Sequence, residues 1–216
     1  LLCTGVSFLS TSMETIAKHT TNKFVVSGRA CHKNRVDKLE IKLEKGKKSC
    51  YLNNTRTTQG KLFLRHPLCL VDAFVNRIVS GSPENRRKTI DRAMFHVEQK
   101  YLTEYKAYNM CLKQRNMALR EKRSIKEIEV WDESLSKHGE NITRMRERHI
   151  TEIKVLFEEM SMIFLGKESK IEFKKGWSGP SLYDELKKNI AKDRILKRTS
   201  CGPQKDDFTI SVSGKK

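Results

Sequence analysis

Apolar and polar residues alternate in two segments near the start of the chain, and this spacing predicts β-strands. The segment of residues 23–31 is short and rich in β-branched side chains. In the segment of residues 36–44, the apolar positions are Val36, Leu39, Ile41 and Leu43. Gly46 and the pair Asn53–Asn54 follow at spacings typical of hairpin turns. We therefore expect a small antiparallel sheet within residues 23–80, with one wet, basic face.

A spacing of three and four residues replaces this alternation after Pro83 and predicts long amphipathic helices. Ser82 can cap the first helix, and Pro83 suits its first turn. One apolar stripe consists of Tyr101, Tyr105, Tyr108, Leu112 and Leu119. The second consists of Ile128, Trp131, Leu135, His138, Ile142, Met145, His149, Ile153, Leu156, Met160 and residues 162–164. The two stripes predict an antiparallel helical hairpin joined near residues 123–126, with a bend at Gly139.

The remaining elements are shorter. Residues 180–196 contain a third amphipathic pattern that can cover the two stripes, and residues 170–177 indicate a short strand or an extended link. Residues 208–212 alternate like a strand of a sheet that is completed elsewhere. The predicted fold class is therefore α+β, with mostly antiparallel β segments and a long-helix domain between them.

The charge of the chain indicates a polyanionic partner. Lysine and arginine number 44 against 26 acidic residues, which gives a net charge of +18. Nucleic acid is favoured over the alternatives of a ribosome, a membrane surface or a merely basic soluble protein. The candidate DNA-binding residues lie in basic clusters: Lys45, Lys47, Lys48, Arg86, Arg87, Arg92, Lys113 and Arg115.

The sequence contains no pattern that indicates catalysis. It has neither a GxxxxGK[ST] phosphate loop nor GxGxxG or HExxH, so no catalytic residue is assigned. None of the six cysteines forms a CxxC pair, and the scattered histidines indicate no metal site. No signal peptide and no apolar run of membrane-spanning length is present, so a reducing cytoplasm is expected.

Five motifs in order resemble those of the RecF family of DNA replication and repair proteins. They are GSPENRRKTIDR (81–92), LKQRNMALR (112–120), WDESLSKHGENI (131–142), GW (176–177) and GPQKDD (202–207). The opening segment 1–12 also resembles the helix that follows the phosphate loop of this family. Motif residues without an assigned role are Gly81, Ser82, Pro83, Asp91, Gln114, Asn116, Gly202, Pro203, Asp206 and Asp207. The chain departs from the family pattern at Gln204 and Lys205, which replace histidine and arginine, and at LVDAF (70–74), which lacks a proline.

The resemblance implies an ABC-type ATPase head interrupted by a helical domain. Residues 1–80 would be part of the head, 81–200 the inserted helical domain and 201–216 a strand that returns to the head. The ATP motifs of the family would lie upstream of Leu1 and downstream of Lys216. We therefore expect ATP and Mg²⁺ to act in the full-length protein, and this interior portion alone to bind neither and to hydrolyse no ATP.

By the same resemblance, the full-length protein would be a bacterial recombination mediator of DNA repair, replication and the SOS response. It would bind ATP and single-stranded or gapped DNA, form an ATP-dependent homodimer and help RecO and RecR to load RecA, without a membrane partner. Two alternatives stay open from the residues alone. One is a helical protein-interaction module that binds through the stripe of residues 128–164, and the other is a generic basic DNA-binding protein.

Overall fold

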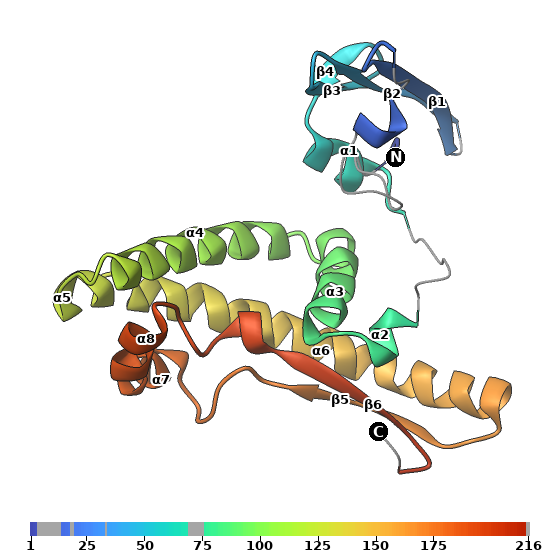
Figure 1. Cartoon of the computed structure of the whole chain (residues 1–216). Coiled ribbons are helices and arrows are strands. Elements are labelled where there is room, and N and C mark those ends of the chain that lie inside the picture. The colour runs from blue at the N-terminus through green and yellow to red at the C-terminus, as the bar shows by residue number, and fades with distance from the viewer. Residues whose placement is uncertain (4–13, 18–19, 33, 69–75, 215–216) are drawn as a thin grey trace. The chain divides into compact units, whose positions relative to one another are not determined.

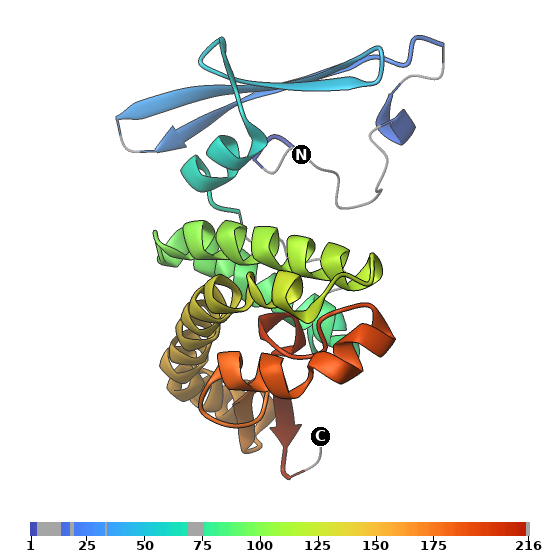
Figure 2. The same cartoon turned by 90° about the vertical axis from the view of Figure 1, so that its left-hand side faces the viewer.

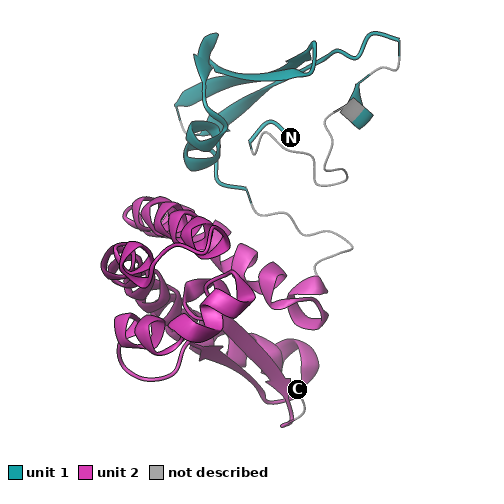
Figure 3. Ribbon diagram, turned by 60° about the vertical axis from the view of Figure 1, so that its left-hand side comes forward, with its two compact units in different colours: residues 1–71 teal, residues 72–216 magenta. Residues whose placement is uncertain are grey.

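The computed structural model describes residues 1–3, 14–17, 20–32, 34–68 and 76–214. The chain divides into two compact units, residues 1–71 and 72–216, shown in teal and magenta in Figure 3. The division falls before position 72, whereas the sequence placed it at 80/81. The segment 70–74 and most of the opening segment 1–12 lie outside the described residues.

The first unit contains the predicted antiparallel sheet. Its strands β1 (Phe24–His32), β2 (Arg35–Glu44), β3 (Lys47–Leu52) and β4 (Thr55–Thr57) are hydrogen-bonded in that order. Two helical segments flank it, η1 (Glu14–Ile16) and α1 (Gln59–Arg65). The turns are where the glycine and asparagines predicted them, since Lys45 and Gly46 have φ of 51° and 70°, and Asn53 and Asn54 have φ of 50° and 66°. Positive φ at both central residues matches the twist of antiparallel strands.

One face of this sheet is apolar and the other is charged. Leu39, Ile41 and Cys50 pack with Leu62 of α1 to form the core of the unit. The opposite face carries Arg29, Lys38, Lys42, Lys47 and Arg56, with Glu40 and Glu44 as its acidic residues on β2. The alternation in the sequence therefore predicted this basic face correctly.

The second unit is built around two long helices. It begins with α2 (Arg77–Ser80), α3 (Pro83–Val97), α4 (Tyr101–Arg120), α5 (Ile125–Glu129) and α6 (Asp132–Leu165). It continues with β5 (Ser169–Lys174), α7 (Leu182–Lys188), α8 (Ile190–Leu196), η2 (Pro203–Lys205) and β6 (Asp207–Val212). The helices α4 and α6 form the predicted antiparallel pair, and α6 lies between α4 and the two-stranded β5–β6 sheet (Figures 1 and 2).

Both predicted stripes contribute to one core. Tyr101 and Tyr108 of α4 pack with Leu135 and Ile142 of α6, and Leu182 of α7 joins them. The helix α6 runs through Gly139 without a break, and the bend expected there stays a prediction. The second stripe is also only partly buried, because its last turns are exposed. The exposed apolar residues near the end of α6 are Val155, Leu156, Met160, Met162, Ile163, Phe164 and Leu165.

The final strand pairs within the second unit. In β6, Ile210 lies opposite Ile171 of β5 in an antiparallel pair, and β5 packs against α6. Residues 170–177 thus supply a strand, one of the two possibilities left by the sequence. The α+β fold class is confirmed, and the assignment of residues 1–80 and 201–216 to one head stays a prediction. None of the described helices has both the length and the apolarity required to cross a bilayer.

Candidate nucleic-acid interface

Arg146 of α6 joins two of the sequence motifs inside the second unit. Its Nε lies 2.9 Å from Asp91 Oδ1, and its Nη1 lies 3.0 Å from Asp206 Oδ2. The same Nη1 donates to the carbonyl oxygen of Pro203 at 2.7 Å. The Tyr101 hydroxyl donates to Asp91 at 2.5 Å, and all of these side chains are buried. Asp91, Pro203 and Asp206 therefore hold α3, α6 and η2 together.

Asp206 has further donors around it. Its carboxylate accepts from the Thr143 hydroxyl at 2.8 Å and from the Gly176 backbone N–H at 2.8 Å. Burial raises the pKa of Asp206 above its ordinary value, although Arg146 and these donors oppose the rise. Gly202, with φ of 118°, allows the chain to turn into this network. These contacts give the GPQKDD motif a structural role.

Arg86 and Arg87 also turn inward. The Arg86 guanidinium forms a two-pronged ion pair with Asp207, at 2.7 and 2.9 Å, and donates to the carbonyl oxygen of Gly81 at 2.7 Å. Arg87 Nη1 donates to the carbonyl oxygen of Asp206 at 2.8 Å. Arg86 is therefore corrected from a DNA-binding residue to an internal anchor.

Ser82 occupies the N-cap position of α3 and Pro83 its first turn, but the Ser82 hydroxyl makes no capping hydrogen bond.

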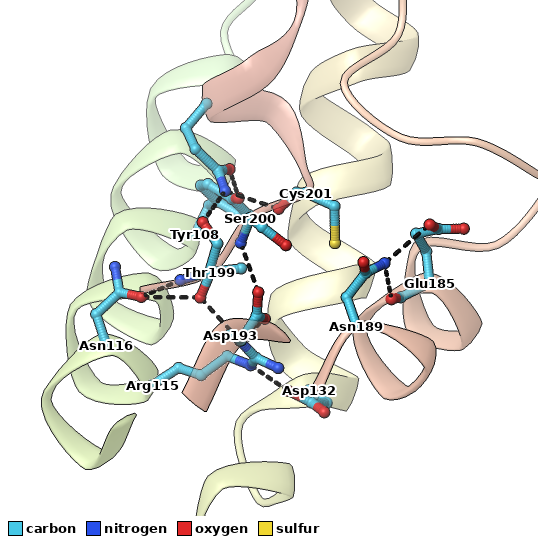
Figure 4. Close-up of polar contacts among 11 residues, drawn as sticks. Tyr108, Arg115, Asn116, Asp132, Glu185, Asn189, Asp193, Thr199, Ser200 and Cys201 are labelled. Carbon is cyan, nitrogen blue, oxygen red and sulfur yellow. Dashed lines mark hydrogen bonds and ion pairs between the residues drawn. The ribbon is translucent and has the colours of Figure 1, made fainter. Parts of the chain in front are cut away.

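Arg115 forms a second buried network, drawn in Figure 4. Its Nε lies 2.6 Å from Asp132 Oδ1, and its Nη1 lies 2.7 Å from Asp193 Oδ2 and 2.9 Å from the Thr199 hydroxyl. The side chain has no exposed surface, so the prediction that Arg115 binds DNA is wrong. The neighbouring motif residue Asn116 accepts the backbone N–H of Thr199 at 2.7 Å. Gln114 is half-buried and lines a shallow hollow beside Trp131.

The sequence contained the signal that places Arg115 and Arg146 inside. Tyr101, Tyr108 and Arg115 are seven residues apart, so they lie on one face of α4. Arg146 falls four residues after Ile142 and four before Ile150, on the apolar side of α6. A cation within an apolar stripe indicates a buried ion pair more strongly than a solvent-exposed DNA contact.

The opposite face of α4 is cationic. Lys106, Lys113 and Arg120 are seven residues apart on this face, and all three are exposed. None of them forms an ion pair with a residue that the structure describes. The exposed residues of α4, which we call the α4 cationic face, include no acidic side chain: Thr103, Lys106, Asn109, Met110, Lys113, Met117 and Arg120. This is the strongest candidate surface for a phosphate backbone in the second unit.

The other predicted DNA-binding residues lie on separate surfaces. Arg92 is exposed on α3, and Arg87 is half-buried. In the first unit, Lys45 and Lys47 are exposed at the β2–β3 turn, whereas Lys48 donates to Gln59 at 2.7 Å and is partly buried. Of the predicted DNA-binding residues, Lys113 thus lies on the α4 cationic face, and Arg92, Lys45 and Lys47 are accessible to solvent. Arg86 and Arg115 are engaged in internal ion pairs. Lys106 shares the exposed seven-residue spacing of Lys113 but was not among the residues predicted from the sequence.

The described residues form no cluster typical of a metal site. They contain no group of three or more histidine, cysteine or acidic side chains placed to hold a metal ion. Of the six cysteines, those described are free thiols, namely Cys3, Cys31, Cys50, Cys111 and Cys201. Burial raises the pKa of the Cys201 thiol to about 12, which opposes thiolate chemistry there.

Known proteins are similar to this chain in both sequence and fold. No protein-family model matches it. The DNA replication and repair protein RecF of Coxiella burnetii is 36% identical over 150 residues, which are 68% of this chain and 42% of the relative. RecF of Pseudoalteromonas translucida is 30% identical over 217 residues, which are 97% of this chain and 60% of the relative. The chain thus spans about two fifths to three fifths of the length of these curated relatives.

A solved structure of the recombination mediator protein RecF–ATP in the RecFOR pathway matches with a TM-score of 0.87. The match covers 99% of this chain and 62% of that chain at 21% sequence identity, so it shows a shared fold. The buried networks account for the motifs that first indicated the resemblance, since Asp91, Asp206 and Arg115 each join distant elements. The sequence relatives and the fold together show that this chain belongs to the RecF family.

Proposed function

We propose that the chain is a DNA-binding portion of a RecF-like recombination mediator for DNA repair, and that the α4 cationic face contacts the sugar-phosphate backbone. The observation that carries the proposal is the unpaired state of Lys106, Lys113 and Arg120 on a helix fixed from its other side by Arg115. Because the helix is rigid, binding costs little backbone conformational entropy to align these cations.

The spacing of the three cations suits a backbone contact that does not read sequence. Seven residues of α-helix rise about 10.5 Å, so the cations extend over roughly 21 Å. Duplex DNA carries one phosphate per about 3.4 Å along each strand, and several phosphates therefore fall within that length. Lysine and arginine on such a face would release counterions, and the affinity would fall steeply as salt is added.

The wider activity is proposed for the full-length protein. We infer that it uses ATP with Mg²⁺ to form a homodimer, binds single-stranded or gapped DNA, and acts with RecO and RecR to load RecA during repair and the SOS response. Support comes from the family and from the RecF–ATP structure that shares this fold. The 216 residues contain no phosphate loop, so we expect this chain alone to hydrolyse no ATP. Turnover above a buffer control would contradict that expectation.

A salt titration tests the DNA contact. The affinity of the chain for a labelled gapped duplex is measured between about 50 and 200 mM salt, and log K is plotted against log salt. The triple variant Lys106→Gln, Lys113→Gln, Arg120→Gln should reduce the magnitude of the slope by about 2.7, which is three contacts at about 0.9 each. An unchanged slope would refute the role of the α4 cationic face.

A matched control is available in the same unit. Lys170, Lys188 and Lys192 are exposed on β5, α7 and α8, away from α4 in the sequence. Replacing these three with glutamine removes the same charge, and it should leave most of the slope intact. If both triple variants lower the slope equally, the effect comes from net charge, and the generic basic DNA-binding protein becomes the better description.

The exposed end of α6 favours protein binding as a second function. Ile163 and Phe164 have relative exposures of 70% and 78%, and they lie within a run of exposed apolar residues. Large exposed apolar surface marks interaction sites in soluble proteins. We propose that this end of α6 contacts a protein component of the recombination pathway. Phe164→Ser should weaken binding to purified RecR or RecO without changing the affinity for DNA. Full retention of RecR and RecO binding would reject the proposed protein contact.

A further inference from the structure

A cavity opens within the second unit where four elements meet. The elements are α3, α4, α6 and η2, and the cavity has a volume of about 220 Å³. Pockets for drug-sized ligands usually have volumes of about 300–1,000 Å³, so this one suits a single ring system. Its lining includes Tyr105 and Asn109 of α4, and the cations Arg87 and Lys88 with the carboxylates Glu84 and Asp91 of α3.

The aromatic side of the cavity is rigid. The Tyr105 ring is held by Phe95 in an edge contact at 5.4 Å and lies 6.1 Å from the Tyr101 ring at an interplanar angle of 27°. Tyr101 in turn is buried and fixed by its hydrogen bond to Asp91. A flat apolar group that enters the cavity therefore meets a tyrosine ring that is already ordered, and stacking there requires little rearrangement.

On the cationic side of the cavity, Arg87 has N–H donors that are not used in hydrogen bonds to described residues. One Nη1–H of Arg87 is used by the carbonyl oxygen of Asp206, and no other hydrogen bond joins the Arg87 guanidinium to a described residue. Lys88 pairs with Glu84 at 2.6 Å, but both side chains are more than 60% exposed. Exposed pairs of this kind contribute little, so Lys88 can exchange Glu84 for a phosphate. An anionic group beside the ring would thus find two cations.

The cavity is continuous with the α4 cationic face, because Asn109 belongs to both. We propose that the cavity receives one unpaired base of a DNA strand whose backbone follows the α4 cationic face. Tyr105 stacks on the base, and Arg87 and Lys88 bind the adjoining phosphate. The Asn109 Nδ2 donates to the carbonyl oxygen of Tyr105 at 2.7 Å, so its amide oxygen and remaining N–H are the groups that reach the base edge. The inference rests on the proposed function and deepens it, since it names a strand with unpaired bases as the ligand of this surface.

Abasic DNA separates base insertion from phosphate binding. The chain is titrated with a single-stranded oligonucleotide and with an oligonucleotide of the same length that lacks every base but keeps every phosphate. Stacking of one base contributes about 1–3 kcal/mol, so the base-containing strand should bind about tenfold more tightly. Equal affinities would overturn the cavity proposal and leave the phosphate contact of the proposed function standing. Failure to bind either strand would instead reject the proposed function.

Two variants locate the effect. Tyr105→Leu keeps an apolar side chain against Phe95 but removes the flat ring, and it should abolish the tenfold preference while the melting temperature confirms folding. Lys113→Gln, on the same helix but outside the cavity, should weaken both strands equally. A preference that survives Tyr105→Leu would place the base elsewhere and overturn the proposal.

A free nucleotide carries the same chemistry as one base of a strand. Titration with deoxyadenosine monophosphate separates these two sources. We expect no saturation at concentrations where the oligonucleotide is fully bound, because the monophosphate cannot use the α4 cationic face. Binding as tight as that of the oligonucleotide would overturn the assignment to a DNA strand.

Discussion

Arg115 Nε lies 2.6 Å from Asp132 Oδ1, and neither side chain has any exposed surface. Asp193 shares the same guanidinium through Nη1 at 2.7 Å, with no exposure of its own. Three elements far apart in the sequence, α4, α6 and α8, are therefore joined by one cation. Burial raises the pKa of Asp132, and Arg115 opposes that rise. The value of such a network lies in fixing one arrangement, since each charge is costly to bury without its partner.

Replacement of Arg115 by alanine should destabilise the second unit severely. The variant leaves the carboxylates of Asp132 and Asp193 buried without their cation, and loss of one partner from a buried pair costs about 3–5 kcal/mol. Urea unfolding followed by tryptophan fluorescence reports on this unit, because Trp131 and Trp177 both lie in it. Lys113→Ala, exposed two residues away, should change stability by less than about 0.5 kcal/mol. A cost of Arg115→Ala below about 1 kcal/mol would contradict the network.

Asp206→Asn tests the network around Arg146. The amide keeps the size of the carboxylate but removes its charge, so Arg146 is left with Asp91 as its ion-pair partner. Because hydrogen bonds to charged groups contribute about 1.5–3 kcal/mol, we expect a loss of about 2 kcal/mol in the same fluorescence experiment. Glu172→Gln, which removes an exposed charge from β5, should have almost no effect. Equal stability of the two variants would show that the Asp206 charge is dispensable.

The alternating and helical periods predicted the elements well, because burial of one face imposes those periods. The strands around Leu39 and the pair α4–α6 follow directly from them. The roles of the charged residues were harder to predict, because net charge does not show whether a given side chain faces the core or the solvent. Arg115 and Lys113 are two positions apart on α4, yet one is fully buried and the other is exposed. The helical period applied to cations as well as to apolar residues separates them.

Pairing between distant segments could not be predicted in the same way. One ion-pair partner of Arg146 is Asp206, sixty residues further along the chain, and no local pattern links them. Likewise, the pairing of Ile171 with Ile210 places β6 in the second unit, whereas the alternation of residues 208–212 specifies a strand without its neighbour. Long-range contacts of this kind depend on tertiary packing rather than on local propensity.

Gly139→Ala should destabilise the second unit even though alanine favours helix. A Cβ at this position would lie 2.7 Å from Leu182 Cδ2 and 3.0 Å from Tyr108 Cε2. Both neighbours are buried, so neither can move away freely. Overpacking costs about 1–3 kcal/mol, against a helix gain of about 1 kcal/mol, and we expect a net loss measurable in urea. Gly60→Ala in α1, where a Cβ meets no atom within 4 Å, should be neutral or stabilising for the first unit. A stabilising Gly139→Ala would contradict the close approach of α6 and α7.

Asp37 should make the stability of the first unit fall in acid. The Asp37 side chain is 2% exposed, and its carboxylate lies 2.7 Å from Arg65 Nε and 2.9 Å from Asn53 Nδ2. The hydrogen bond from Arg65, with that from Asn53 and the charge of Arg35, holds the pKa of Asp37 well below its ordinary value of 3.8. Since the unfolded chain binds the proton more readily, the contribution of Asp37 is complete above about pH 5. It is lost as the pH falls below the unfolded pKa toward the folded one.

The Asp37 carboxyl carbon, followed by nuclear magnetic resonance, should therefore titrate below pH 3.8. In urea unfolding followed through the amide resonances of β2, the wild-type chain should lose stability between about pH 5 and pH 3. Asp37→Asn should be less stable at pH 7 and should show a flatter profile through that window, because its amide does not titrate. Asp184→Asn, which removes an exposed carboxylate from α7 in the second unit, should leave the profile of β2 unchanged. A titration of Asp37 at or above its ordinary pKa would mean that the contacts with Arg65 and Asn53 do not form in solution.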